Sequence, residues 1–329
     1  MVDAGASGAG SERLRIAMVA LNYAPSVGGA QEHVRRVAEG LAARGHAVEV
    51  ITTDALRSPS GADPGRIDPL HDRLADVTVQ RHRVSAWLRR VQRAVRWVSV
   101  QLPGRPPDVA DVVLHPLLAG PYAPSMAGAV RSARRRCDVV LAWSAPFLTL
   151  VGPLRRRRAA AAVVAVPLVH AQRRGPHRVV ARALRRADGV VASTSYGATS
   201  RWPWAWSSPA PWCCRPGPTW TASPTSTRRW RARLGLPERP TVGYVGRLAA
   251  YKGVDTLLDA APQLWASHPE LTVLVAGSTT GWAGHRRAAD QLGDDRVAIR
   301  EDVSPRRSRW PCRPATWWPC HPGTNRSGW

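Results

Sequence analysis

The sequence predicts an α/β protein with two Rossmann-like domains, the second of them incomplete. The main observation is a pattern of strand, glycine loop, helix and strand that occurs twice, over residues 14–52 and again over residues 241–276. The strands are short apolar runs of the kind that lie buried on both faces of a parallel sheet. A chain of 329 residues is long enough for two such domains.

The first pattern opens with the apolar run LRIAMVAL at residues 14–21, which has the length of a strand. The loop that follows carries Gly28 and Gly29, and apolar spacing then predicts a helix that stops at Gly45. A strand over residues 47–52 completes a right-handed βαβ unit. This places the two glycines at the carboxyl edge of a parallel sheet, where open α/β sheets bind ligands. A tight turn without a ligand is the less favoured alternative.

The rest of the first domain holds a polar stretch, a basic stripe and further strands. Residues 56–76 are polar and rich in Pro and Asp, which predicts a surface loop. Residues 81–100 mix arginines with Trp87 and Trp97 at helical spacing. This helix either packs on the domain with a solvated basic face, which is the commoner case, or lies on an anionic membrane. Strands are predicted at 137–142, 160–168 and 189–193, and a helix over 179–187.

One histidine stands at a strand end. His170 follows the strand predicted over residues 160–168, at its carboxyl end. A lone histidine is usually structural or exposed. Its position in the predicted fold makes His170 a candidate catalytic residue.

The second pattern begins with a strand and a glycine turn, followed by Arg247 and Lys252. Backbone N–H groups freed at such a turn, together with two cations, suit a diphosphate. Lys252 is the only lysine among the 47 basic residues of the chain. The remaining elements are predicted as a helix over 254–265 and strands over 271–276 and 295–299.

Composition narrows the class of partner. The net charge of +24 suggests nucleic acid, a membrane surface or a phosphorylated substrate, although a GC-rich gene also explains the arginine excess. The five cysteines lack zinc spacing, so no cysteine zinc site is expected. Neither a signal peptide nor an apolar run of about 20 residues is visible. The expected location is the cytoplasm, with peripheral contact at the inner face of the membrane as an open alternative.

Taken together, four stretches resemble the GT-B glycosyltransferases of family 4, the retaining and metal-independent group. By this resemblance, Arg247 and Lys252 would bind the diphosphate of a nucleotide-sugar donor, and their charge would replace a metal. Gly28 and Gly29 would face the same cleft, and His170 would lie near the reacting sugar carbon. The acceptor would be a glycan, a lipid or a sugar phosphate, with no cofactor. The stretches are RIAMVALNYAPSVGGAQEHVRRVAEGLAARGHAVEVIT, ALRRADGVVASTS, VGYVGRLAAYKGVDTLLDA and LTVLVAG.

Two other functions stay open at this stage. A basic nucleic-acid-binding protein would explain the charge and the Trp residues interleaved with Arg, although the sequence has no nucleic-acid fold signature. A nucleotide-sugar epimerase with the GT-B fold is the other alternative. The spacing between Arg247 and Lys252 favours a transferase.

Two segments depart from the rest of the chain. Residues 196–236 and 305–329 hold ten of the 15 Trp and four of the five Cys, without strand or helix spacing. They stand where the family has a PPG-x-D-x-x-RF linker and an E-x7-E motif. Back-translation followed by reading in the shifted frame restores the linker, and places the first glutamate of the motif on the codons of Thr324 and Asn325.

We therefore expect a frame-shifted, C-terminally truncated product that is inactive or weakly folded. The expected division has four parts, namely an acceptor-side domain over residues 1–195, a disordered linker over 196–236, a partial donor-side domain over 237–304 and an aberrant tail over 305–329.

Overall fold

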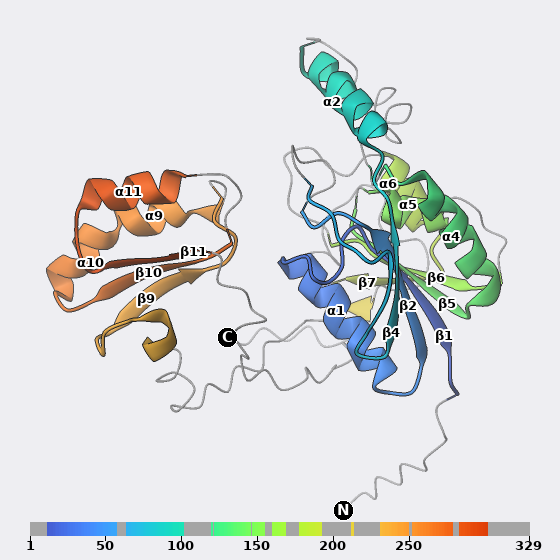
Figure 1. Ribbon diagram of the computed structural model, residues 1–329, viewed down its shortest axis with the longest axis horizontal. Helices are drawn as coiled ribbons and strands as arrows, with labels where there is room; N and C mark the ends of the chain where they lie inside the picture. Colours follow the sequence, from blue (N-terminus) through green and yellow to red (C-terminus); the bar gives the residue numbers. More distant parts are fainter. Residues whose placement is uncertain are drawn as a thin grey trace, which may run out of the picture. The chain divides into compact units, whose positions relative to one another are not determined.

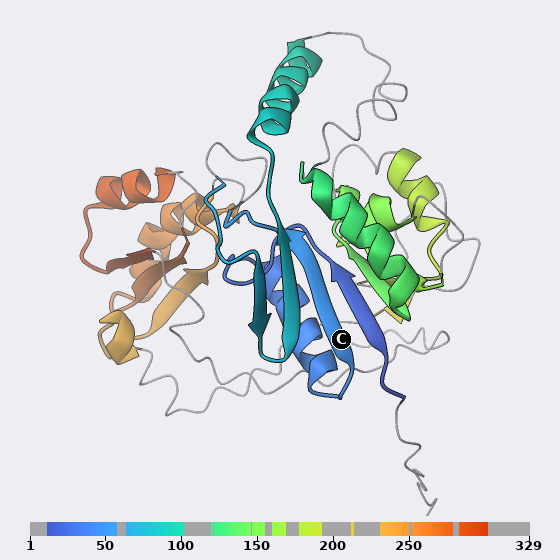
Figure 2. The same cartoon turned by 45° about the vertical axis from the view of Figure 1, so that its right-hand side comes forward.

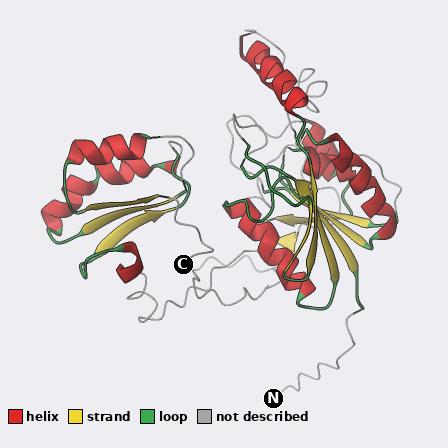
Figure 3. Ribbon diagram, in the orientation of Figure 1, coloured by secondary structure: helices red, strands yellow, loops and turns green. Residues whose placement is uncertain are grey.

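The computed structural model describes residues 12–57, 64–101, 120, 122–145, 147–154, 160–168, 178–192, 212–213, 231–249, 252–278 and 283–301. The chain divides into two compact units, unit 1 (Met1–Pro216 with Thr316–Trp329) and unit 2 (Gly217–Ala315). Each unit holds its own sheet with helices packed on it (Figures 1 and 3). The two Rossmann-like domains predicted from the sequence are confirmed, whereas the four-part division stays a prediction.

Unit 1 contains an eight-stranded sheet in the order β3-β4-β2-β1-β5-β6-β7-β8. Its neighbouring strands are parallel, apart from the antiparallel pair β3–β4. The run β4-β2-β1-β5-β6-β7 has the 3-2-1-4-5-6 order of a doubly wound sheet. The strands are β1 (Arg15–Val19), β2 (Ala47–Thr53), β3 (His71–Leu74), β4 (Val77–His82), β5 (Val139–Trp143), β6 (Ala162–Val166), β7 (Gly189–Ala192) and β8 (Trp212–Cys213).

Helices cover both faces of this sheet (Figure 2). Side chains alternate along β1, so that Ile16 and Met18 pack in the core on the α1 side. Ala17 and Val19 pack in the core on the opposite side. Burial on both faces explains why the strands are continuous apolar runs. The helices are α1 (Gly29–Ala42) on one face and α4 (Pro124–Arg136), α5 (Leu148–Leu154) and α6 (Arg178–Leu184) on the other, with α2 (Ala86–Gln101) after β4.

Unit 2 contains a three-stranded parallel sheet in the order β11-β10-β9. This is the 3-2-1 half of the doubly wound order that unit 1 shows in full. Among the described residues β9 pairs on one side only, with β10, and Val245 at its end is 62% exposed. The elements are β9 (Thr241–Val245), α9 (Val254–Asp259), α10 (Ala261–Ser267), β10 (Thr272–Gly277), α11 (Gly284–Leu292) and β11 (Val297–Glu301).

The stretch over residues 56–76 was predicted as a loop, and this is wrong for its last part. Residues 71–74 form β3, which pairs antiparallel with β4. The connection is a two-residue hairpin in which Ala75 and Asp76 have φ values of 47° and 64°. Such a turn usually contains glycine, and the polar residues of β3 suit an edge strand. The sequence therefore contains neither a glycine that would indicate the turn nor an apolar run that would indicate the strand.

Two further expectations are corrected. The single helix predicted over residues 254–265 is two short helices, α9 and α10, that meet at Ala260. Pro262 causes the break, because it has no N–H to donate and its ring clashes with the preceding turn. Within the segment predicted to lack regular structure, Trp212–Cys213 forms β8 and pairs with β7. The rest of residues 196–230 and the tail at 305–329 lie outside the described residues.

The two strand-end glycines of unit 2 are packed closely. A Cβ placed on Gly277, the last residue of β10, would lie 1.5 Å from the carbonyl oxygen of Gly246. The N–H of Gly246 donates to the carbonyl of Ala276 over 3.0 Å, which fixes the approach of the two chain segments. Only glycine fits at position 277, because the obstacle is backbone and not a movable side chain.

We predict that Gly277→Ala destabilises unit 2 by about 3 kcal/mol or more, since the clash can be relieved only by separating β9 from β10. Hydrogen–deuterium exchange of the β10 amides with increasing urea measures this loss. The matched control is Gly40→Ala in the middle of α1, where the nearest atom is the movable end of Arg44. That change should leave stability equal or raise it by up to about 1 kcal/mol. Equal effects at the two positions would contradict the packing argument.

Candidate functional site

The loop between β1 and α1 is fixed by two buried polar side chains. The Asn22 amide donates hydrogen bonds to the carbonyl oxygens of Ala55 (2.7 Å) and Arg57 (2.9 Å). The Arg81 guanidinium, also buried, donates to the carbonyl of Ala24 over 2.9 Å. A second nitrogen of Arg81 donates to the carbonyl of Pro69 over 2.9 Å. These bonds hold the loop in one conformation at the carboxyl edge of the sheet, as binding loops require.

The backbone conformation of Gly28 does not require glycine, and neither does the space around Gly29. Gly28 has an extended backbone, with φ at 163°, that other residues also adopt. Gly29 is the first residue of α1, and a Cβ placed on it would meet no atom within 4 Å. Both lie at the carboxyl edge of unit 1, as the sequence predicts. Space outside this loop is compatible with the close approach of a ligand to the backbone.

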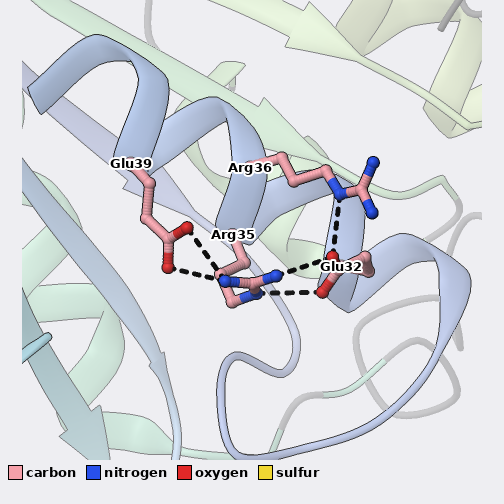
Figure 4. Close-up of polar contacts among 4 residues, drawn as sticks. All are labelled: Glu32, Arg35, Arg36 and Glu39. Atoms are coloured by element: carbon pink, nitrogen blue, oxygen red, sulfur yellow. Dashed lines mark hydrogen bonds and ion pairs between the residues drawn. The ribbon is translucent and has the colours of Figure 1, made fainter. Parts of the chain in front are cut away.

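Four charged side chains on α1 form ion pairs with one another (Figure 4). Glu32 accepts hydrogen bonds from Arg35 and Arg36, and Arg35 also binds Glu39 at 2.9 Å. Burial opposes ionisation of Glu32, but the two arginines outweigh it and hold the pKa of Glu32 below its ordinary value. Glu32 and Glu39 lie three and four residues from Arg35, so these ion pairs stabilise the helix. Arg35 is a poor candidate for a substrate cation.

His33 and Trp143 meet at the point where the strand order reverses. Their ring centroids lie 5.0 Å apart in an edge-to-face arrangement. Trp143 ends β5, the neighbour of β1, and its Nε1 is buried without a hydrogen-bond partner among the described residues. Burial, and then the charge of Arg36, lowers the pKa of His33, which favours a neutral imidazole. The sequence analysis missed this pair, because no local pattern links residue 33 to residue 143.

In unit 2 the loop after β9 is tied to the end of β10. The N–H of Leu248 donates to the carbonyl of Ser278 over 2.9 Å. The hydroxyl of Tyr244 donates to the carbonyl of Arg247 over 2.7 Å. The N–H of Lys252 donates to the carbonyl of Ala249 over 2.9 Å. These bonds fix the backbone at the carboxyl edge of the sheet.

This geometry corrects one part of the sequence-based site. The turn was expected to free backbone N–H groups for an anion, but those of Gly246, Leu248 and Lys252 already donate within the unit. The side chains of Arg247 and Lys252 are exposed at this edge. An anion here would therefore depend mainly on the two cations.

A third group at the same edge is Glu301, the last residue of β11. Hydrogen bonds from Arg286 and then from His285 lower the pKa of Glu301 to about 2. The Nε2 atom of His285 lies 2.7 Å from a Glu301 oxygen, and its side chain is buried. Glu301 is thus held ionised between two partners, which suits it to anchoring α11 on the sheet rather than to proton transfer.

The predicted site residues are therefore distributed over both units. Arg247 and Lys252 share the carboxyl edge of unit 2, and Gly28 and Gly29 share that of unit 1. A common cleft between them stays an expectation. His170 lies outside the described residues, four positions after the end of β6.

The described residues hold no group of three or more His, Cys, Asp or Glu side chains arranged to bind a metal ion. The metal-independent reaction stays an expectation. No helix in the described part of the chain has the length and apolar character to cross a bilayer.

Part of this chain is similar in sequence to known proteins. Residues 226–297 match the family of glycosyl transferases group 1. The chain is 31% identical over 191 residues to a GDP-mannose-dependent alpha-(1-6)-phosphatidylinositol monomannoside mannosyltransferase of Mycolicibacterium smegmatis, a match covering 55% of the chain and 50% of that protein. It is 38% identical over 80 residues to a D-inositol 3-phosphate glycosyltransferase of Corynebacterium jeikeium, covering 23% of the chain and 19% of that protein. The chain thus spans half or less of the curated relatives it matches.

Solved structures show the same fold at low sequence identity. The Anabaena protein Alr3699/HepE in complex with UDP-glucose has a TM-score of 0.55 and 17% identity, with 88% of this chain and 69% of that chain covered. An alpha,alpha-trehalose 6-phosphate synthase from Burkholderia multivorans has a TM-score of 0.55 and 15% identity, with 88% and 72% covered. These solved structures show the fold expected from the sequence, with two Rossmann-like domains of the GT-B type. They do not favour the nucleic-acid-binding or epimerase alternatives.

The burial of His33 has a consequence for pH-dependent stability. Because the pKa of His33 in the folded protein lies below its unfolded value of 6.5, the unfolded chain binds the proton more readily. Stability is therefore retained above that pH and falls as the pH drops below about 6.5. We predict that His33→Gln flattens the fall in the urea unfolding midpoint of unit 1 between neutral and mildly acidic pH. An unchanged slope would show that the imidazole does not titrate against burial.

Proposed function

We propose that this chain derives from a retaining glycosyltransferase of family 4. It would transfer a hexosyl group from a nucleoside diphosphate donor to a hydroxyl acceptor. The observation that carries the proposal is the pair Arg247 and Lys252, exposed at the carboxyl edge of a parallel sheet within the stretch that matches glycosyl transferases group 1. No metal is invoked, since the two side chains can supply the positive charge.

In this proposal the chemistry is mainly electrostatic. The bond between the anomeric carbon of the sugar and the diphosphate oxygen breaks, and negative charge collects on the leaving diphosphate. Arg247 and Lys252 stabilise that charge, which grows on the way to the transition state. The acceptor hydroxyl attacks the same face of the sugar that the diphosphate leaves, so the configuration is retained, and its proton passes to the departing diphosphate oxygen. His170 is proposed beside the reacting carbon because of its place after β6.

The names of the relatives bear on the acceptor. One curated relative is named for a phosphatidylinositol monomannoside and the other for inositol 3-phosphate. Both names describe an inositol that carries phosphate. For this chain we propose an acceptor with a phosphorylated polyol or sugar, either free or linked to lipid, and a net charge of +24 suits such an anion.

We further propose that residues 196–236 and 305–329 are read in a shifted frame, and that the product is inactive for this reason. Support comes from the half-sheet of unit 2, where the described strands give only the 3-2-1 half of a doubly wound order. The shifted frame at residues 305–329 encodes a helix, an apolar strand and the start of the glutamate motif. A strand there would pair with the free side of β9.

We predict that Lys252→Ala in a frame-restored protein lowers kcat/KM for the nucleotide-sugar donor by about 100-fold, because an ammonium is removed from the leaving diphosphate. The affinity for the free nucleoside diphosphate should fall by about tenfold, the usual worth of one charge-assisted hydrogen bond. Turnover assays and calorimetric titration measure the two effects.

The matched control is Arg239→Ala. Arg239 is also exposed, but it precedes β9 and so lies at the opposite edge of the sheet. Donor turnover should survive this change. If Lys252→Ala retains normal turnover, or if both variants lose it equally, the role assigned to Lys252 is wrong.

A further inference from the structure

Arg286 and Glu301 form an ion pair at the carboxyl edge of unit 2. Arg286 lies in the first turn of α11, and Glu301 is the last residue of β11. The Nε and Nη2 atoms of Arg286 donate to different oxygens of Glu301, so the contact is bidentate. The side chain of Arg286 is 59% exposed and that of Glu301 is 20% exposed. An anion from solvent can therefore reach the guanidinium.

The start of α11 lies on the same edge as the cations Arg247 and Lys252. In a parallel sheet the helix after each strand begins at the carboxyl edge, so α9 and α11 both begin there. The two helices pack side by side (Figure 1). Lys252 stands just before Gly253, the N-cap of α9. Packed helices lie about 8–10 Å apart, a gap that a lysine and an arginine side chain can bridge through one diphosphate.

Glu301 is held in place by a second partner. The Nε2 atom of His285, a buried side chain, lies 2.7 Å from a Glu301 oxygen. Hydrogen bonds from Arg286, and then from His285, lower the pKa of Glu301 to about 2, so its negative charge is present at neutral pH. Glu301 thus neutralises Arg286 at this edge. An ion pair as exposed as this one contributes little to stability, so Arg286 can exchange its partner at low cost.

We infer that Arg286 is a third cation of the diphosphate site and that Glu301 is its internal counter-ion, which a bound diphosphate displaces. This inference rests on the proposed function, because it extends the site assigned to Arg247 and Lys252. A guanidinium binds carboxylate and phosphate through the same bidentate geometry. Two phosphate oxygens can thus replace those of Glu301, which keeps its bond to His285.

The internal counter-ion gives the site a preference among anions. A ligand has to compete with a carboxylate that is already in position, so a multiply charged diphosphate gains more than a monophosphate. An ion pair that only anchors α11 would act differently. In that case removal of the charge of Glu301 would leave anion affinity unchanged or weaken it.

The test is calorimetric titration of the full chain with inorganic pyrophosphate at physiological salt. Glu301→Gln removes the competing charge but keeps an oxygen that can accept from His285. We expect it to raise the affinity about tenfold, because Arg286 no longer gives up a bidentate partner to bind the ligand. Arg286→Gln should lower the affinity about tenfold. Arg286→Lys, which keeps the charge without the bidentate fork, should lower it about threefold.

The double variant separates displacement from a general effect of charge. In the Arg286→Gln background, Glu301→Gln should raise the affinity only about twofold, because no guanidinium remains to be released. An equal gain in both backgrounds would overturn the inference, since the carboxylate would then act by long-range repulsion alone.

The matched control for Glu301 is Asp290→Asn, which removes the same charge from an exposed position of α11. Asp290 lies in the last turn of that helix, about 9 Å along the axis from its start. The change should leave the affinity within about twofold, because a charge about a Debye length away is largely screened. An effect equal to that of Glu301→Gln would also overturn the inference.

Lys252→Ala distinguishes failure of this inference from failure of the proposed site. If Lys252→Ala loses pyrophosphate binding and Arg286→Gln does not, the inference is wrong and the site of Arg247 and Lys252 stands. If the full chain and the Glu301→Gln variant both fail to bind pyrophosphate, the inference and the site are both wrong.

Discussion

Parallel pairing of the strands determines where this chain can bind a ligand. In a parallel sheet every strand ends at the same edge, so the loop after β1 opens at that edge of the unit 1 sheet, and the loops after β9 and β10 open at that edge of the unit 2 sheet. The buried side chains of Asn22 and Arg81 hold the glycine loop of unit 1 at this edge through hydrogen bonds to backbone carbonyls. In unit 2 the edge is held by the close backbone approach of Gly246 and Gly277. The exposed cations Arg247 and Lys252 extend from this rigid base.

The strand order of a doubly wound sheet also shows which neighbour β9 lacks among the described strands of unit 2. In a doubly wound sheet the first strand lies between the second and the fourth, as β1 lies between β2 and β5 in unit 1. Among the described residues β9 has only its β10 neighbour, and Val245 is exposed at its end. An open edge of this kind invites incorrect pairing and lowers stability. The proposed diphosphate site on the β9 loop would therefore depend on a further strand, which in our proposal the shifted reading frame encodes.

Local patterns in the sequence predicted most of the fold. Buried strands are apolar runs in the sequence. The predicted first residues of β1 and β10 therefore lie within one residue of the observed ones. The hairpin before β4 was missed because Ala75 and Asp76 adopt a turn that ordinarily needs glycine. For the candidate site, Lys252 was proposed because it is the only lysine of the chain, and Gly28 because of its place after the first strand; both roles stay predictions. Contacts across long sequence separations, such as that of His33 with Trp143, left no local signal.

The central claim is that β9 and its cationic loop belong to a donor-binding sheet whose remaining strands are encoded out of frame. Resequencing the genomic DNA across the codons for Tyr196–Arg231, and from Val303 past the stop codon, tests it most directly. The account predicts single-base insertions or deletions that restore a continuous frame through the linker and the glutamate motif. A DNA sequence that matches this chain at every codon would contradict the claim.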